Sequence, residues 1–151
     1  EDGSSKVLEY NCRFGDPETQ PIMLRLKSDL VELVEAALDG KLDTVTAEWD
    51  PRASVGVVLA AGGYPDSYKK GDVIHGLPQQ ETSGEKVFHA GTLLKDDQVV
   101  TNGGRVLCIC ALGNSVAEAQ QSAYRLVDTI TWEGMYCRRD IGHRAIRREQ
   151  A

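Results

Sequence analysis

Three polar side chains that could do chemistry alternate near the start of the chain, at Glu9, Asn11 and Arg13. The residues around them keep a period of two, which predicts a β-strand over residues 6–12. On a strand, side chains two residues apart point the same way and lie about 6.6 Å from each other. We therefore expect Glu9 and Asn11 to converge on one or two small cations, with Arg13 continuing the same face.

The residue types suit a particular kind of site. Magnesium is commonly bound by one or two oxygen-bearing side chains, such as those of Glu9 and Asn11, and by phosphate oxygens and waters. The guanidinium of Arg13 suits a bidentate grip on a phosphate or a carboxylate. This combination is typical of a nucleotide-triphosphate site, but a polar strand face that is merely solvated has the same spacing. The spacing alone leaves both interpretations open.

The elements that would position these residues can be read from the following sequence. Asp16 can cap a helix, and Pro17 suits the first helical position. Ser28 offers a second cap, before an apolar stripe of helical spacing that ends at Gly40. A polar connector over residues 41–52 follows, and the chain then changes to short strands. We place a domain boundary in this connector.

The second part of the chain predicts antiparallel strands covered by one helix, and the fold class is α+β. Ser115 and Glu118 form a capping box ahead of an amphipathic helix. A hairpin turn with positive φ is expected at Asn102-Gly103, and the arginine-rich tail is expected to form a short helix with surface salt bridges. The strands are expected at residues 53–61, 86–91, 92–95, 98–101 and 105–112, with Asp96-Asp97 between the third and the fourth.

Other residues with possible chemistry form weaker patterns. The three histidines lack the spacing of a metal site, and Cys108 and Cys110 would share one strand face without further ligands. A zinc or redox protein is therefore disfavoured. The glycine pairs at 62–63 and 103–104 match neither a P-loop nor a dinucleotide-binding fingerprint. The role of the loop at 62–65, which turns the chain out of the preceding strand, stays open.

Composition excludes several classes of protein. The chain has 151 residues, 41% of them hydrophobic and 26% charged, which is typical of a folded domain. The net charge of −6 disfavours nucleic acid as a partner. No apolar run approaches the roughly 18 residues of a membrane span, and the start lacks the pattern of a signal peptide. Four cysteines without a Cys-x-x-Cys pair suggest reduced thiols and a cytoplasmic location.

Longer runs of the sequence resemble one enzyme family. The run at 9–20 reads EYNCRFGDPETQ, and it is followed by GVVLAAGGYP at 56–65, VFHAGT at 87–92 and VTNGGRVL at 100–107. Together these runs resemble phosphoribosylamine–glycine ligase, also called glycinamide ribonucleotide synthetase. The similarity extends over nearly the whole chain, to Ile146.

The resemblance implies an ATP-grasp enzyme of purine synthesis that joins glycine to 5-phosphoribosylamine and releases ADP and phosphate. In that family ATP phosphorylates the glycine carboxylate, and the amine then attacks the glycyl phosphate. Glu9 and Asn11 resemble the ligands of Mg²⁺ or Mn²⁺, in agreement with their spacing. Arg13 would stabilise the transferring phosphoryl group. Asp16 and Glu18 lie in the same run and would line the substrate pocket.

The resemblance also implies that much of the enzyme lies outside this sequence. Family members are longer, with an N-terminal substrate domain and an ATP-grasp portion that clasps the nucleotide. Residues 1–46 would be the end of the ATP-grasp domain, and residues 47–151 a small β-rich C-terminal domain of the rudimentary hybrid-motif kind. We expect the chain to need the N-terminal portion for activity. The alternatives are a segment of a related ATP-grasp ligase and a non-catalytic interaction domain.

Overall fold

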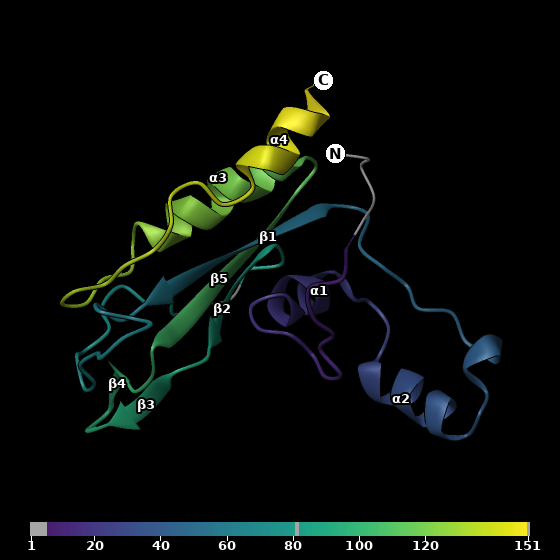
Figure 1. The fold of residues 1–151 in the computed structure, drawn as a ribbon, viewed down its shortest axis with the longest axis horizontal. Coiled ribbons are helices and arrows are strands. Elements are labelled where there is room, and N and C mark those ends of the chain that lie inside the picture. Colours follow the sequence, from purple (N-terminus) through teal and green to yellow (C-terminus); the bar gives the residue numbers. More distant parts are fainter. Residues whose placement is uncertain (1–5, 81, 151) are drawn as a thin grey trace.

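The computed structural model describes residues 6–80 and 82–150 and has α+β architecture (Figure 1). Strands predominate in the second part of the chain, and the helices lie before and after them. The elements are α1 (Thr19–Arg25), α2 (Leu30–Leu38), a 3₁₀ turn η1 (Leu42–Thr44), β1 (Ala53–Ala60), β2 (Glu85–His89), β3 (Thr92–Lys95), β4 (Gln98–Thr101), β5 (Arg105–Gly113), α3 (Val116–Val127) and α4 (His143–Glu149).

The strands form two antiparallel sheets. The larger sheet has the order β1-β5-β2, so that β5 is its central strand, and β3 pairs with β4 in the smaller one. β1 pairs with β5 from Ala53 opposite Gly113 to Ala60 opposite Arg105, with a shift in register beside Ala60. All five strands expected from the sequence are present, and their ends differ from the expected bounds by no more than two residues.

The two sheets are successive parts of one long hairpin, β2-β3 followed by β4-β5. Its turn lies at Asp96 and Asp97, which both adopt positive φ, at 49° and 59°. The hairpin turn expected at Asn102-Gly103 was wrong, because Gly103 does not have positive φ and β4 does not pair with β5. The backbone instead crosses closely there, where a Cβ on Gly91 would lie 2.7 Å from Gly103 Cα. Glycine is needed for this approach rather than for a turn.

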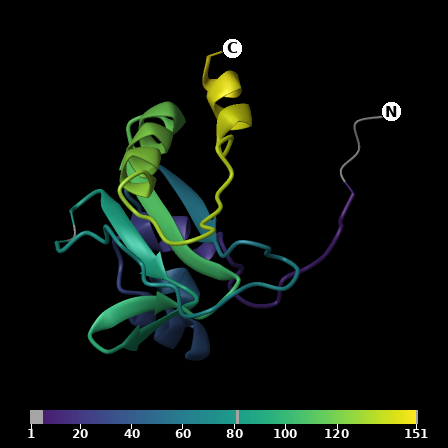
Figure 2. The ribbon, with the colours of Figure 1, turned by 90° about the vertical axis from the view of Figure 1, so that its left-hand side faces the viewer.

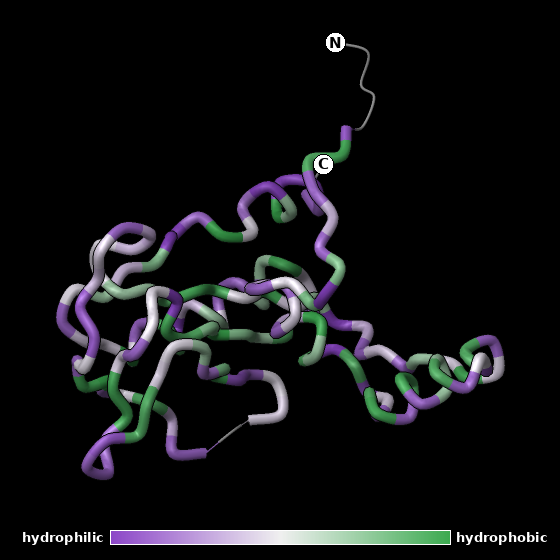
Figure 3. The backbone as a smooth tube through the Cα atoms, turned by 60° about the horizontal axis from the view of Figure 1, so that its bottom comes forward, coloured by the Kyte–Doolittle hydropathy of each residue, from purple (hydrophilic) through white to green (hydrophobic). Residues whose placement is uncertain are grey.

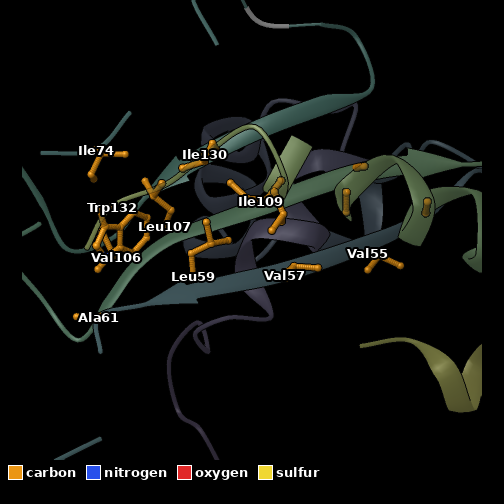
Figure 4. Close-up of a cluster of buried hydrophobic side chains, with 14 residues drawn as sticks. Val55, Val57, Leu59, Ala61, Ile74, Val106, Leu107, Ile109, Ile130 and Trp132 are labelled. Carbon is orange, nitrogen blue, oxygen red and sulfur yellow. The ribbon is translucent and has the colours of Figure 1, made fainter. Parts of the chain in front are cut away.

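One face of the larger sheet forms the core with α3 (Figure 4). Alternate residues of β1 point into it, as the period of two requires. The helix contributes small residues, which allow it to approach the sheet closely. The fully enclosed members are Val57, Leu59, Val106, Leu107, Ile109, Ala111, Ala119, Ala123 and Val127.

The other face of the sheet lies against α1, and β5 is therefore buried on both sides. Packing around Gly56 on β1 is tight, because a Cβ there would lie 3.3 Å from the Sγ atoms of two cysteines on β5 and 3.4 Å from Pro21 Cδ of the helix. Cys108 and Cys110 share this face as predicted, with their Sγ atoms 3.7 Å apart. The hydrogen bond with Cys108, together with burial, raises the pKa of Cys110, so this thiol remains protonated.

The strand expected over residues 6–12 was wrong. Residues 6–11 have no regular structure, and the chain bends at Cys12 and Arg13. A strand needs a neighbour for its backbone hydrogen bonds, and none of the described residues pairs with this segment.

The helix starts also differ from the prediction. α1 begins at Thr19 instead of Pro17, and Asp16 does not cap it. At α2 the N-cap is Asp29, whose side chain accepts from Val31 N at 2.7 Å, rather than Ser28. The Ser28 hydroxyl instead accepts from Glu48 N at 2.7 Å. This hydrogen bond joins the two ends of the loop that contains α2 and η1. The local sequence around Ser28 does not reveal it.

α2 and η1 form an excursion from the rest of the fold, seen at the right of Figures 1 and 3. Hydrogen bonds close its base where residues 25–27 meet residues 48–50. Lys27 N donates to Glu48 O at 2.9 Å, and Asp50 N donates to Arg25 O at 2.7 Å. α2 ends before Gly40, which has positive φ, as predicted.

The cap of α3 gives a test of the core helix. Ser115 Oγ accepts from Glu118 N at 3.1 Å, while Glu118 Oε2 accepts from Asn114 N at 2.9 Å. We expect Ser115→Ala to lower the free energy of unfolding by about 1 kcal/mol, because a helix-terminal N–H loses its partner. Ser122→Ala, in the middle of the same helix, should be nearly neutral. Urea denaturation of both variants checks this, and equal effects would contradict the assigned cap.

Candidate functional site

The predicted metal ligands lie on the exposed segment that leads into the fold, drawn in purple in Figure 2. Within the described part of the chain, Glu9 and Asn11 make no hydrogen bond or ion pair. Their oxygen atoms are free to bind a cation. Nothing in the described residues fixes the two side chains relative to each other.

The described residues contain no preformed cage of side chains for a metal ion. No group of three or more His, Cys, Asp or Glu side chains is close enough to hold a metal ion. Magnesium does not need such a cage, since one or two protein oxygens and substrate phosphates suffice. The donor chemistry of Glu9 and Asn11 therefore fits this ion.

Arg13 stands at the end of the exposed segment, and one of its guanidinium nitrogens is engaged. Nη1 donates to the carbonyl of Phe14 at 2.8 Å, which bends the side chain back along its own backbone. The other nitrogens make no hydrogen bond or ion pair with the described residues. The guanidinium can therefore still grip a phosphate or a carboxylate.

Asp16 is the residue at which the exposed segment joins the sheet. Its Oδ2 lies 3.2 Å from Arg105 Nε, and its carbonyl accepts from Arg105 Nη1 at 3.0 Å. Its other carboxylate oxygen accepts from Gln20 Nε2 at 3.0 Å. Arg105 is the first residue of β5, so this contact ties the segment to the central strand.

Glu18 lies at the start of α1, as its N-cap residue. Its carboxylate folds over the buried Gly15, and a Cβ at that position would displace this flexible side chain. The Thr19 hydroxyl donates to the Gly15 carbonyl and continues the turn. Glu18 also borders an open hollow of about 600 Å³ that Ile22 and Trp49 help to line.

A pocket of about 290 Å³ lies beside Pro17, the residue that follows Asp16. We call it the β1 pocket, because alternate residues of β1 form its floor. Its rim combines two arginines with two tyrosines. The lining residues are Pro17, Gly56, Val58, Ala60, Tyr64, Arg105, Tyr136, Cys137, Arg138 and Ile141.

The C-terminal side of the β1 pocket is held by a network of hydrogen bonds. Tyr136 and Ala60 exchange two backbone hydrogen bonds, of 2.8 and 3.0 Å. Arg138 grips Asp140 through two nitrogens, at 2.9 and 2.8 Å. This hydrogen-bonded pair lowers the pKa of Asp140 and raises that of Arg138. The Tyr124 hydroxyl donates to the carbonyl of Arg138 at 2.8 Å.

The surface role expected for the arginine-rich tail agrees with these contacts. Besides the pair of Arg138 and Asp140, Arg139 Nη1 lies 2.6 Å from Asp128 Oδ1. Two histidines are also engaged locally, His89 with the Thr92 hydroxyl at 3.0 Å and His143 with the Asp140 carbonyl at 2.6 Å. No helix among the described residues is long and apolar enough to cross a membrane.

Sequence reasoning missed the role of Arg105. It is 89 residues from Asp16 along the chain, and no local spacing connects the two. The tyrosines and Arg138 of the β1 pocket were likewise not recognised as neighbours of Pro17. The structure thus brings Asp16 and Glu18 together at the start of α1, and it leaves Glu9, Asn11 and Arg13 outside the packed fold.

Comparison with known proteins gives a consistent picture. The family model described as "Phosphoribosylglycinamide synthetase, C domain" matches residues 54–144. The phosphoribosylamine–glycine ligase of Vibrio cholerae is 73% identical over 149 residues, which are 99% of this chain and 35% of that protein. The enzyme of the same name from Escherichia coli K12 is 69% identical, over 98% of this chain and 35% of that protein.

A solved structure is similar as well. The crystal structure of phosphoribosylamine–glycine ligase from Thermotoga maritima superposes with a TM-score of 0.73 at 41% identity. The match covers 92% of this chain and 34% of that one. The chain thus spans about a third of the length of the relatives that it matches.

The contact between Asp16 and Arg105 gives a second test. Both side chains are more than a third exposed, so we expect Asp16→Asn to cost less than about 1 kcal/mol of global stability. The local effect should be larger, with faster amide hydrogen exchange at Thr19 and Gln20. Lys41→Ala, which removes an exposed ion pair with Asp39, is the matched control. Unchanged exchange at both amides in Asp16→Asn would show that the ion pair does not anchor the segment.

Proposed function

The chain belongs to the phosphoribosylamine–glycine ligase family, and from that premise we propose that it is the C-terminal part of such an enzyme. The complete enzyme joins glycine to 5-phosphoribosylamine, with ATP as co-substrate and a glycyl phosphate as intermediate. The observation that carries the proposal is the 73% identity over almost the whole chain. The four cysteines form no disulfide, which is compatible with the cytoplasm.

In this proposal Glu9 and Asn11 hold Mg²⁺ or Mn²⁺ at the nucleotide phosphates. The bound ion supplies positive charge that offsets the charge of those phosphates. Arg13 stabilises the phosphoryl group as it passes to the glycine carboxylate, because a guanidinium donates to two oxygens at once. The side-chain oxygens of Glu9 and Asn11 and the remaining guanidinium nitrogens of Arg13 have no partner among the described residues, which supports these roles.

Asp16 and Glu18 contribute to the substrate pocket in different ways. The Asp16 carboxylate is occupied by Arg105 and Gln20, so it shapes the pocket by holding the turn. The Glu18 carboxylate makes no ion pair with the described residues and remains available to an amine. Its position beside an open hollow supports direct substrate contact.

The apolar surface of the first 49 residues supports the division into two units. We propose that residues 1–46 complete an ATP-grasp domain and that residues 47–151 form a C-terminal domain of the rudimentary hybrid-motif kind. α2 has an apolar stripe but no buried residue, so its stripe needs a partner. The exposed large apolar residues of this part are Val7, Leu8, Tyr10, Phe14, Ile22, Val31, Val34, Leu38, Leu42, Val45 and Trp49.

The partner proposed for this surface is the preceding portion of the same enzyme. The relatives have about two thirds of their length outside the matched region, which is ample to cover it. A non-catalytic interaction domain would use the same surface to bind a separate protein. The two functions differ in whether the chain completes an active ligase.

The catalytic proposal is tested in a hybrid ligase, in which residues 1–151 replace the matching C-terminal 35% of the Escherichia coli enzyme. Glycine-dependent ADP formation is measured. We expect Glu9→Gln and Asn11→Ala to lower kcat at least about 10- to 100-fold, since changes even in outer ligands of metal sites have effects of this size. Arg13→Ala should lower kcat by about 1,000-fold, because the charge of the phosphoryl group loses its counterpart.

Glu32→Gln, on the exposed side of α2, is the matched control and should retain full activity. A folded hybrid that is inactive without any substitution would contradict the proposed function. An active hybrid that tolerates Glu9→Gln would contradict the assigned metal site.

The docking proposal is tested by Leu38→Glu. Leu38 is 83% exposed in this chain, so the substitution should leave the stability of the 151-residue protein within about 0.5 kcal/mol. In the hybrid ligase the same side chain would be covered, and we expect a loss of about 2 kcal/mol or more, because a charge is buried without a partner. Thermal unfolding of both proteins measures the difference. Equal effects in the two contexts would show that this face of α2 stays open in the enzyme.

A further inference from the structure

The β1 pocket offers a binding site to which sequence reasoning assigned no role. Its volume of about 290 Å³ is close to the lower end of the range for small-molecule sites, about 300 Å³, and exceeds what glycine needs. The floor is apolar, from Gly56, Val58 and Ala60, and the rim carries two guanidinium groups and two phenol rings. An apolar floor with a few directed polar groups is the usual composition of a ligand site.

Arg105 and Arg138 each bind an aspartate through two of their guanidinium nitrogens, and the third nitrogen remains free to bind a ligand. Arg105 uses Nε and Nη1 for Asp16, and Arg138 uses Nε and Nη2 for Asp140. Nη2 of Arg105 and Nη1 of Arg138 therefore have no partner among the described residues. A guanidinium that is already fixed loses little freedom when it binds an anion.

The chemistry of these groups selects one kind of ligand. Guanidinium N–H groups match the oxygens of a phosphate monoester, and the tyrosine rings offer faces on which a sugar can lie. The carboxylates of Asp16 and Asp140 offset much of the positive charge, so directed N–H groups rather than net charge would give the affinity. A free anion without a sugar would then bind more weakly than a sugar phosphate.

The β1 pocket lies close in sequence to the segment with the proposed catalytic residue Arg13. Pro17 forms one wall and follows Arg13 by four residues, so their Cα atoms are at most about 14 Å apart. A ligand in the pocket therefore lies within reach of the segment to which phosphoryl transfer is assigned.

We propose that the β1 pocket binds the phosphoribosyl end of the amine substrate, with Arg105 and Arg138 holding its phosphate. This inference rests on the proposed function and adds a place for one of its substrates. The phosphate takes no part in the reaction. Its contacts therefore contribute to binding of this substrate and leave the phosphorylation of glycine unaffected.

Binding is tested directly on the 151-residue chain by NMR titration with ribose 5-phosphate. We expect chemical-shift changes at Tyr64, Tyr136 and Arg138 that saturate at lower concentration than with inorganic phosphate or ribose. ATP is titrated in parallel, because it carries a phosphate and a ribose as well. Preferential binding of ATP, or equal responses to all ligands, would overturn the assignment.

A second test measures the KM of the hybrid ligase for each of its three substrates. Arg138→Ala should raise the KM for phosphoribosylamine about tenfold or more and leave the KM values for ATP and glycine unchanged. Arg138→Lys should give a smaller rise in KM, since one donor is kept. Arg147→Ala, an exposed change on α4, is the control and should alter none of the three.

The outcomes separate the two proposals. An active hybrid in which Arg138→Ala changes all three KM values equally, or none of them, would overturn the pocket assignment and leave the ligase function standing. An inactive but folded hybrid would instead contradict the proposed function. In that case the titration with ribose 5-phosphate still decides whether the pocket binds a sugar phosphate.

Discussion

The antiparallel pairing of β5 with β1 is the constraint on which the rest of the structure depends. β5 is the central strand, and its nine residues are buried except for Arg105 at its start. One face of the pair forms the core with α3, and the other face receives α1 over Gly56. A slip of one residue would exchange the two faces and turn Cys108 and Cys110 toward α3. The register of this one pair therefore decides where the helices and the site can lie.

Arg105 connects this strand pair to the segment that carries the proposed site residues. Through its contacts with Asp16, the start of β5 determines the position of the turn before α1. Glu9 and Asn11 lie only a few residues away, but they belong to a segment without regular structure. The described chain thus positions one wall of the β1 pocket, and it does not fix the positions of Glu9 and Asn11, the proposed metal ligands.

The sequence predicted those features that depend on local pattern. Alternation predicted the five strands, capping predicted α3 after Ser115, and turn chemistry predicted the turn at Asp96-Asp97. All of these were confirmed. The family was also recognisable, because long runs such as GVVLAAGGYP carry far more information than any single spacing.

The features that were missed depend on contacts between distant residues. Residues 6–12 alternate like a strand, but alternation does not supply a neighbouring strand. Gly103 is required by the close approach of Gly91 rather than by positive φ, and the anchor at Arg105 joins positions 89 residues apart. Ser28 was expected to cap α2, but its hydroxyl instead accepts a hydrogen bond from the backbone N–H of Glu48, across the loop.

We expect the segment with Glu9, Asn11 and Arg13 to gain regular structure only when the rest of the ligase is present. Amide hydrogen exchange of residues 6–14, compared between the 151-residue chain and the hybrid ligase, tests it most directly. The account predicts rapid exchange in the chain alone and, in the hybrid, slow exchange with the alternating protection of a paired strand. Equally rapid exchange in an active hybrid would contradict it.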